Sequence, residues 1–154
     1  MKRYFRLFLT AVIIIMSVIA TYAHDFEVDG IYYNKNGYKS VYVTFKGSLY
    51  NSYTNEYTGK VEIPSTVTYS NVEYTIHGID MYAFKECSDV TSVVIPEGAV
   101  FIGPEAFWNC TSLKSVNIPE NITRIAEGTF YNCTSLTDIG ISNVETEIET
   151  YAFE

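Results

Sequence analysis

The sequence has little charge, and most of what it has is negative. Of its 154 residues, 10 are lysine or arginine and 18 are aspartate or glutamate. Three of the basic residues, Lys2, Arg3 and Arg6, lie at the N-terminus, so the remainder has 7 basic residues against 18 acidic ones and a net charge of −11. Nucleic acids and anionic membranes attract basic surfaces, and we therefore expect neither as a partner. Hydrophobic residues make up 47% of the chain, which excludes a disordered protein.

Residue types that carry catalysis or bind metals are also scarce. The chain has two histidines and three cysteines. It lacks Gly-x-Ser-x-Gly, His-Glu-x-x-His, Cys-x-x-Cys and phosphate-binding glycine motifs. Asp25, Glu27 and Asp29 resemble the start of a calcium loop, but Asn36 stands where a bidentate glutamate is needed. We expect no catalytic residue, no cofactor and no metal site, and so no enzyme.

The first 23 residues have the pattern of a secretory signal peptide. Residues 1–6 are short and basic, residues 7–19 are almost continuously apolar, and Thr21 and Ala23 supply small residues at a cleavage site. The apolar run is shorter than the roughly 20 residues that cross a bilayer. We predict cleavage before His24, no stable membrane span afterwards, and an extracytoplasmic protein that is secreted or held at the cell surface.

The C-terminal part of the sequence repeats at an interval of 23 residues. One column of equivalent positions holds only phenylalanine. The other columns are also apolar throughout. The complete set of columns is Phe84, Phe107, Phe130 and Phe153; Ile79, Ile102, Ile125 and Ile148; Cys87, Cys110 and Cys133; Val90, Leu113 and Leu136; Val93, Val116 and Ile139; and Ile95, Ile118 and Ile141. Columns stay apolar together when each unit is one turn of a solenoid, because equivalent side chains then stack on one another. The sequence therefore predicts a repeat solenoid.

Within each unit, one short segment alternates between apolar and polar residues. In residues 115–118, Val116 and Ile118 are predicted to point inward while Ser115 and Asn117 face solvent. Stacking such segments gives a parallel β-sheet. Residues 104–109 and 126–132 are predicted to form short helical or irregular returns.

Residues 24–78 lack this register, and residues 24–60 are predicted to form an antiparallel β-hairpin cap over the first unit. Asp29-Gly30 predicts a two-residue hairpin turn, since both positions must accept positive φ. Ile63-Pro64 precedes Ile95-Pro96 by 32 residues, which indicates an earlier unit carrying a nine-residue hairpin insertion around Ser70-Asn71. The predicted division is a signal peptide at 1–23, an N-terminal β cap at 24–60, and repeats at 61–154 of which the last is incomplete.

The repeat pattern resembles a known family. It is carried by Ala106-Phe107, Cys110, Leu113, Val116-Asn117-Ile118-Pro119 and Ile125. This pattern is similar to the BspA-like leucine-rich repeats of bacterial surface and secreted proteins, closely over residues 61–154 and more loosely over 26–33. The resemblance implies a leucine-rich-repeat fold and adhesion to host matrix proteins or to other cells.

The general leucine-rich pattern places Asn or Cys after each strand. Here only Asn121 falls at that place, so we expect no asparagine ladder and expect the cysteine column to take a comparable role. Adjacent turns lie within about 5 Å of each other, but parallel Cβ vectors aim the sulfurs poorly for a disulfide. Buried free thiols are favoured over a bridge.

The solvent-facing strand positions are the candidate binding face. They are Ser92, Val94, Ser115, Asn117, Asp138 and Gly140, with Glu97 and Glu120 at the rim. We expect them to bind a protein or another cell-surface macromolecule. The alternative is a structural spacer or scaffold within a longer surface protein. Residues 47–59, which include Tyr50, Tyr53 and Tyr57, are either a tyrosine-rich binding loop or an exposed polar connection.

Residues 148–153 begin a further unit that the sequence does not complete. Leu136, Ile139 and Ile141 would then form an exposed apolar rung that Ile148 and Phe153 cover only in part. Exposed apolar columns and open strand edges favour association. We expect either self-association through this rung or continuation of the protein beyond Glu154.

Overall fold

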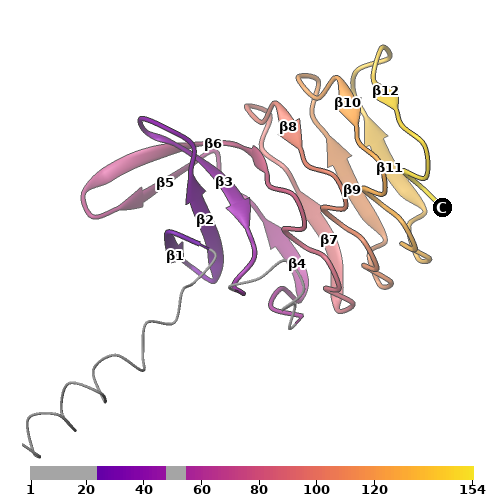
Figure 1. Cartoon of the computed structure of the whole chain (residues 1–154), viewed down its shortest axis with the longest axis horizontal. Coiled ribbons are helices and arrows are strands. Elements are labelled where there is room, and N and C mark those ends of the chain that lie inside the picture. Colours follow the sequence, from indigo (N-terminus) through magenta and orange to yellow (C-terminus); the bar gives the residue numbers. More distant parts are fainter. Residues whose placement is uncertain (1–23, 48–54) are drawn as a thin grey trace, which may run out of the picture.

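The computed structural model describes residues 24–47 and 55–154, and within these ranges the chain forms β-strands and turns without a helix (Figure 1). The expected signal peptide lies outside the described residues. The strands are β1 Phe26–Val28, β2 Ile31–Lys35, β3 Ser40–Thr44, β4 Gly59–Glu62, β5 Thr66–Tyr69, β6 Val72–Ile79, β7 Val90–Val94, β8 Phe101–Ile102, β9 Ser115–Ile118, β10 Arg124–Ile125, β11 Asp138–Ile141 and β12 Glu147–Ile148.

The repeat units build a four-stranded parallel sheet in the order β11-β9-β7-β4. Equivalent positions are Cα partners in it, because Val93 pairs with Val116 and Val116 pairs with Ile139. Strand β4 pairs in parallel with β7, so it belongs to this sheet although it spans the expected boundary between cap and repeats. The predicted solenoid, in which each unit contributes one strand to a parallel sheet, is confirmed.

A second, narrower row of short strands lies on the other side of the solenoid. Ile79 pairs with Ile102 between β6 and β8, and Ile125 pairs with Ile148 between β10 and β12. The returns between the two rows are successive turns, which is the irregular one of the two predicted alternatives, and neither return is helical. They turn tightly because equivalent residues adopt positive φ, namely Tyr82, Glu105, Gly128 and Tyr151.

The core is a set of stacked columns. The rings of Phe84, Phe107, Phe130 and Phe153 follow one another with centroid separations of 5.0, 5.2 and 5.2 Å. Tyr57 extends this stack from the cap, with its ring 4.5 Å from that of Phe84. Offset stacking of this kind adds to the free energy of area burial.

Tyr57 is 3% exposed, so this residue belongs neither to an exposed binding loop nor to an exposed polar connection. Its hydroxyl accepts a hydrogen bond from the Tyr32 amide at 3.1 Å and donates one to the Thr44 carbonyl at 2.5 Å. Burial raises the pKa of Tyr57 well above its usual value. This tyrosine therefore joins the cap to the repeats, while Tyr50 and Tyr53 lie outside the described residues.

Strands β1, β2 and β3 of the predicted cap belong to a larger sheet that also includes β5 and β6, in the order β1-β2-β3-β6-β5, with β8 attached to β6. Its hairpins turn at the predicted dipeptides, with φ of 52° and 77° at Asp29 and Gly30 and of 50° and 61° at Ser70 and Asn71. Strands β3 and β6 are parallel neighbours. Because β6 also pairs with β8, the cap continues directly into the second row of the solenoid.

The C-terminal unit is less buried than the units before it. Leu136, Ile139 and Ile141 are partly buried against the core, and Ile148 and Phe153 are 52% and 42% exposed. These values agree with the expected apolar rung of Leu136, Ile139 and Ile141, which Ile148 and Phe153 cover only in part.

Candidate binding face

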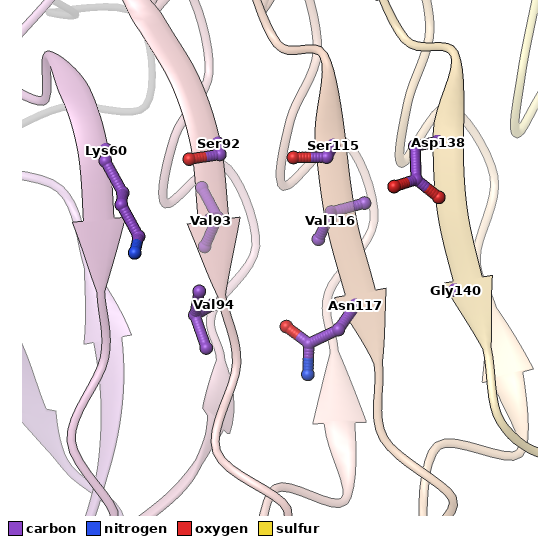
Figure 2. Close-up of a pocket in the computed structure, with 9 residues that line it drawn as sticks. All are labelled: Lys60, Ser92, Val93, Val94, Ser115, Val116, Asn117, Asp138 and Gly140. Carbon is purple, nitrogen blue, oxygen red and sulfur yellow. The ribbon is translucent and has the colours of Figure 1, made fainter.

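A row of four side chains crosses the outer surface of the parallel sheet. Lys60, Ser92, Ser115 and Asp138 are successive Cα partners on β4, β7, β9 and β11, and Figure 2 shows them side by side. They face outward because they alternate with the inward-facing column of Val61, Val93 and Val116. Neighbouring strands are about 4.8 Å apart, so the row spans about 14 Å.

This surface is hollowed. A shallow depression of about 330 Å³ is lined by Lys60, Ser92, Val93, Val94, Ser115, Val116, Asn117, Asp138 and Gly140. The structure thus brings together six of the eight predicted residues. Glu97 and Glu120 are exposed but do not line the depression.

Lys60 also belongs to this lining. It was not among the predicted residues, because the predicted boundary placed Lys60 in the cap. The 32-residue offset contained the information. It aligns residues 60–64 with residues 92–96, so that Lys60 corresponds to Ser92. An insertion between the two units hid this equivalence from the 23-residue register.

Three polar groups in the depression have no partner in the described part of the chain. They are the hydroxyls of Ser92 and Ser115 and the carboxylate of Asp138. Lys60 forms an ion pair with Glu62 on the same strand, and both side chains are well exposed. At Gly140 a Cβ atom, if present, would contact only the Asn117 Cα, at 4.0 Å. The space above Gly140 is therefore free of other protein atoms. The face therefore offers hydroxyls, one carboxylate and one ammonium group to a ligand.

Asn117 also has a structural role that was not predicted. Its side-chain amide donates to the Ile95 carbonyl and accepts from the Ile95 amide, both at 2.8 Å. The backbone pairing of β7 with β9 ends at Val93 and Val116, and the amide takes over the bonding beyond this point. Asn117 lines the depression, but its polar atoms are already used within the solenoid.

The cysteines brace the returns. Cys87 and Cys110 are fully buried and Cys133 is partly buried, and all three are free. The thiol of Cys110 donates to the Phe84 carbonyl and that of Cys133 to the Phe107 carbonyl, each at 3.0 Å. These bonds link each unit to the one before it, as expected for this column. Burial raises the pKa of Cys87 to about 12, and the neighbouring Cys133 thiol together with burial raises that of Cys110 far above its usual value.

A short ladder of side chains that was not predicted from the sequence lies on the return side. The Asn132 amide donates to the Asn109 side-chain oxygen at 2.7 Å, and the Asn109 amide donates to Glu86 at 2.8 Å. The three residues are 23 apart and all have positive φ. Asn tolerates this conformation better than most residues, which is a clue that the sequence did contain.

The aromatic rings on the return side cover one another. Trp108 stacks on Tyr131 with centroids 4.0 Å apart, and the Lys85 ammonium lies 5.1 Å from the Trp108 ring. Gly128 makes room for the indole, since an added Cβ would lie 3.0 Å from its Cε3 and Cζ3 atoms. These ring faces are occupied within the chain, which favours the strand face as the binding surface.

The acidic residues near the N-terminus act in the hairpin. The Asp25 carboxylate accepts a hydrogen bond from the Lys35 amide at 2.7 Å. In residues 24–47 and 55–154, no three potential metal-ligating side chains converge. The same part of the chain contains no helix with the length and apolar character needed to cross a membrane.

Comparison with known proteins identifies the repeat. The family model described as the BspA type leucine rich repeat region matches six copies over residues 50–154. The chain belongs to this BspA-type leucine-rich-repeat family. No curated relative matches it.

Solved structures of bacterial leucine-rich-repeat proteins share the architecture. A leucine-rich repeat protein from Bacteroides ovatus ATCC 8483 is 32% identical with a TM-score of 0.74 over 85% of this chain. A leucine rich cell surface protein from Faecalibacterium prausnitzii A2-165 is 30% identical with a TM-score of 0.61 over 80% of this chain. The BspA-type chain spans only 33% and 32% of these two proteins.

A third similar structure is a leucine-rich repeat protein from Bacteroides capillosus ATCC 29799. It is 26% identical, with a TM-score of 0.65, and the match covers 84% of this chain and 88% of that one. None of the three is named as an enzyme.

Proposed function

We propose that this BspA-type protein is a binding module that holds a macromolecular partner on the strand face of its solenoid. The observation that carries the proposal is the depression over β4, β7, β9 and β11, with its unpartnered hydroxyls and carboxylate. Side chains on rigid strands are held in place before binding, which lowers the entropy cost of association. Solenoids present such extended surfaces with few structural elements.

The proposed location is extracytoplasmic, either secreted or at the cell surface. Two observations support it, the signal-peptide pattern of residues 1–23 and the Faecalibacterium prausnitzii relative described as a cell surface protein. The family resemblance favours adhesion to host matrix proteins or to other cells. A partner on the bacterial exterior fits a face that carries no catalytic group.

The test uses two matched serine variants of the secreted protein. Ser115 lies in the depression, whereas Ser112 lies in the turn before the same strand, and both are partly exposed. Binding of labelled protein to immobilised matrix proteins and to intact cells would be measured for wild type, Ser115→Arg and Ser112→Arg. We expect Ser115→Arg to lose binding and Ser112→Arg to retain it, with both melting temperatures unchanged.

Equal loss in both variants, or no loss in either, would contradict the strand face as the binding surface. Absence of binding by the wild-type protein to every matrix protein and cell type would favour the spacer function instead.

A further inference from the structure

The row across the strand face has opposite charges at its two ends. Lys60 stands at one end and Asp138 at the other, with the two serine hydroxyls between them (Figure 2). The Asp138 side chain is exposed and has no partner in the described part of the chain. The ends are about 14 Å apart, since three strand spacings separate them.

The surroundings of the row are acidic. Glu62, Glu97 and Glu120 are exposed close to the ends of β4, β7 and β9. Together with Asp138 they make four carboxylates against two ammonium groups, that of Lys60, which Glu62 already pairs, and that of Lys114, the exposed residue before Ser115. Such a potential attracts a basic ligand and repels nucleic acids and polyanions. None of the nine lining residues is aromatic, so the depression offers no ring face for stacking.

An extended peptide matches the length and the chemistry of this row. It rises about 3.3 Å per residue, so positions i and i+4 lie about 13 Å apart. Side chains at i, i+2 and i+4 point to the same side of an extended chain. A peptide lying across the strands therefore places three side chains along the row between Asp138 and Lys60.

We propose that the strand face binds an extended segment of a partner protein with a basic residue over Asp138 and an acidic residue four positions away at Lys60. The residue midway between them is small and polar and bonds with the hydroxyls of Ser115 and Ser92. On binding, the ammonium group of Lys60 changes its partner from Glu62 to the acidic residue of the peptide. This inference rests on the proposed function of the strand face and adds the chemistry of its partner.

The test is selection of random linear peptides, displayed on phage, against the immobilised full-chain protein. We expect enrichment of sequences with a basic and an acidic residue four positions apart. An enriched peptide is then titrated against variants. Asp138→Lys should weaken binding about tenfold or more, because like charges then face each other. The control Glu127→Lys makes the same charge change at an exposed residue of the return side and should leave the affinity unchanged.

A second expected result ties specificity to the row itself. The Asp138→Lys variant should bind more tightly to a peptide with acidic residues at both positions than the wild type does. Melting temperatures of both variants close to that of the wild type would show that the fold is intact.

The outcomes separate this inference from the proposed function. Enriched peptides without the charge spacing whose binding is lost in Ser115→Arg would overturn the inference and leave the proposed function standing. So would a failure to enrich any peptide while binding to matrix proteins still depends on Ser115. Peptides that bind with unchanged affinity to both the Ser115→Arg and the Asp138→Lys variants would contradict this inference and the proposed function alike.

Discussion

Asn117 holds two backbone groups of the neighbouring unit with one side chain. Its amide satisfies both the N–H and the C=O of Ile95, at a point where the strands no longer pair. Ile95 is 1% exposed, so water has little access to these groups if the amide is removed. Leaving a buried polar group unsatisfied costs about 1–3 kcal/mol.

We therefore predict that Asn117→Ala lowers the free energy of unfolding by about 1–3 kcal/mol. Ser115→Ala on the same strand should change it by no more than about 0.5 kcal/mol, because the hydroxyl has no partner to lose. Urea denaturation of the two variants would measure both values. Equal stability of the two variants would show that the Asn117 amide contributes nothing to the solenoid.

The cysteines give a second prediction at this scale. Cys87 and Cys110 are buried and burial raises their pKa, so neither forms a reactive thiolate at neutral pH. Titration of the native protein with a thiol reagent should modify Cys133 alone and slowly, since only Cys133 is partly exposed. All three should react after denaturation. A total of one equivalent after denaturation would indicate a disulfide and contradict the free thiols.

Part of the strand face could be predicted residue by residue. Alternation along the strands was enough to place Ser92 and Ser115 outside and Val93 and Val116 inside. The bonding of Asn117 could not be predicted, because it depends on where the pairing of β7 with β9 stops.

Among the elements, the phenylalanine stack is the central support. Phe107 is fully buried between Phe84 and Phe130, whereas Phe153 at the end of the stack is 42% exposed. We predict that Phe107→Ala lowers the free energy of unfolding by about 3–5 kcal/mol, because it leaves a cavity and removes two stacking contacts. Phe153→Ala should cost clearly less. Thermal or urea unfolding of both variants measures the difference, and equal losses would contradict the stack as the support.

The contact of Glu149 with the preceding unit should depend on pH. The Arg124 guanidinium and the Glu127 amide hold the pKa of Glu149 below its usual value of 4.5. A lowered pKa in the folded state means that the stabilisation is fully present above about pH 4.5 and is lost as the pH falls through the lowered pKa.

We therefore predict that the melting temperature of Glu149→Gln falls less than that of the wild type when the pH is lowered below 4.5. Glu145→Gln, at another exposed position of the same unit, should follow the wild type. Calorimetric melting across this pH range makes the comparison. Identical pH dependence in all three proteins would contradict the role of Glu149.

The returns were the elements least predictable from the sequence. Their apolar spacing fitted both a helical turn and a series of tight turns. Positive φ at Tyr82, Glu105 and Tyr151 decides for tight turns, and these are residue types that rarely adopt it. The stacked units impose this conformation on them, so local propensity gave no indication of it.

At the scale of the whole molecule, stability should decrease along the solenoid. Strand β9 has neighbours on both sides, whereas β11 pairs only with β9 within the described residues and is at most partly buried. We predict that amide hydrogen exchange is slowest in β6, β7 and β9 and fastest in β11 and β12. Mass spectrometry of the exchanging protein would measure this gradient, and uniform protection would contradict it.

The architecture of the repeats could be predicted from the 23-residue register alone, because each apolar residue of a column needs an equivalent apolar residue in the next unit. The topology of the cap could not. Strands β3 and β6 are parallel neighbours, although a long stretch of chain separates them. Neither strand has a sequence pattern that identifies the other as its partner. Turn residues predicted the hairpins, but pairing between distant strands depends on the assembled sheet.

The register of the stacked columns has a consequence for inheritance. Each unit meets its neighbours through the same phenylalanine, isoleucine and cysteine positions, so neighbouring units are interchangeable at their contacts. Unequal recombination within the gene that adds or removes one whole unit therefore preserves the contacts within these columns. The row of exposed side chains then becomes one position longer or shorter. Genes of this kind can therefore change the binding surface of the protein by changing the number of units, and the intermediate proteins still fold.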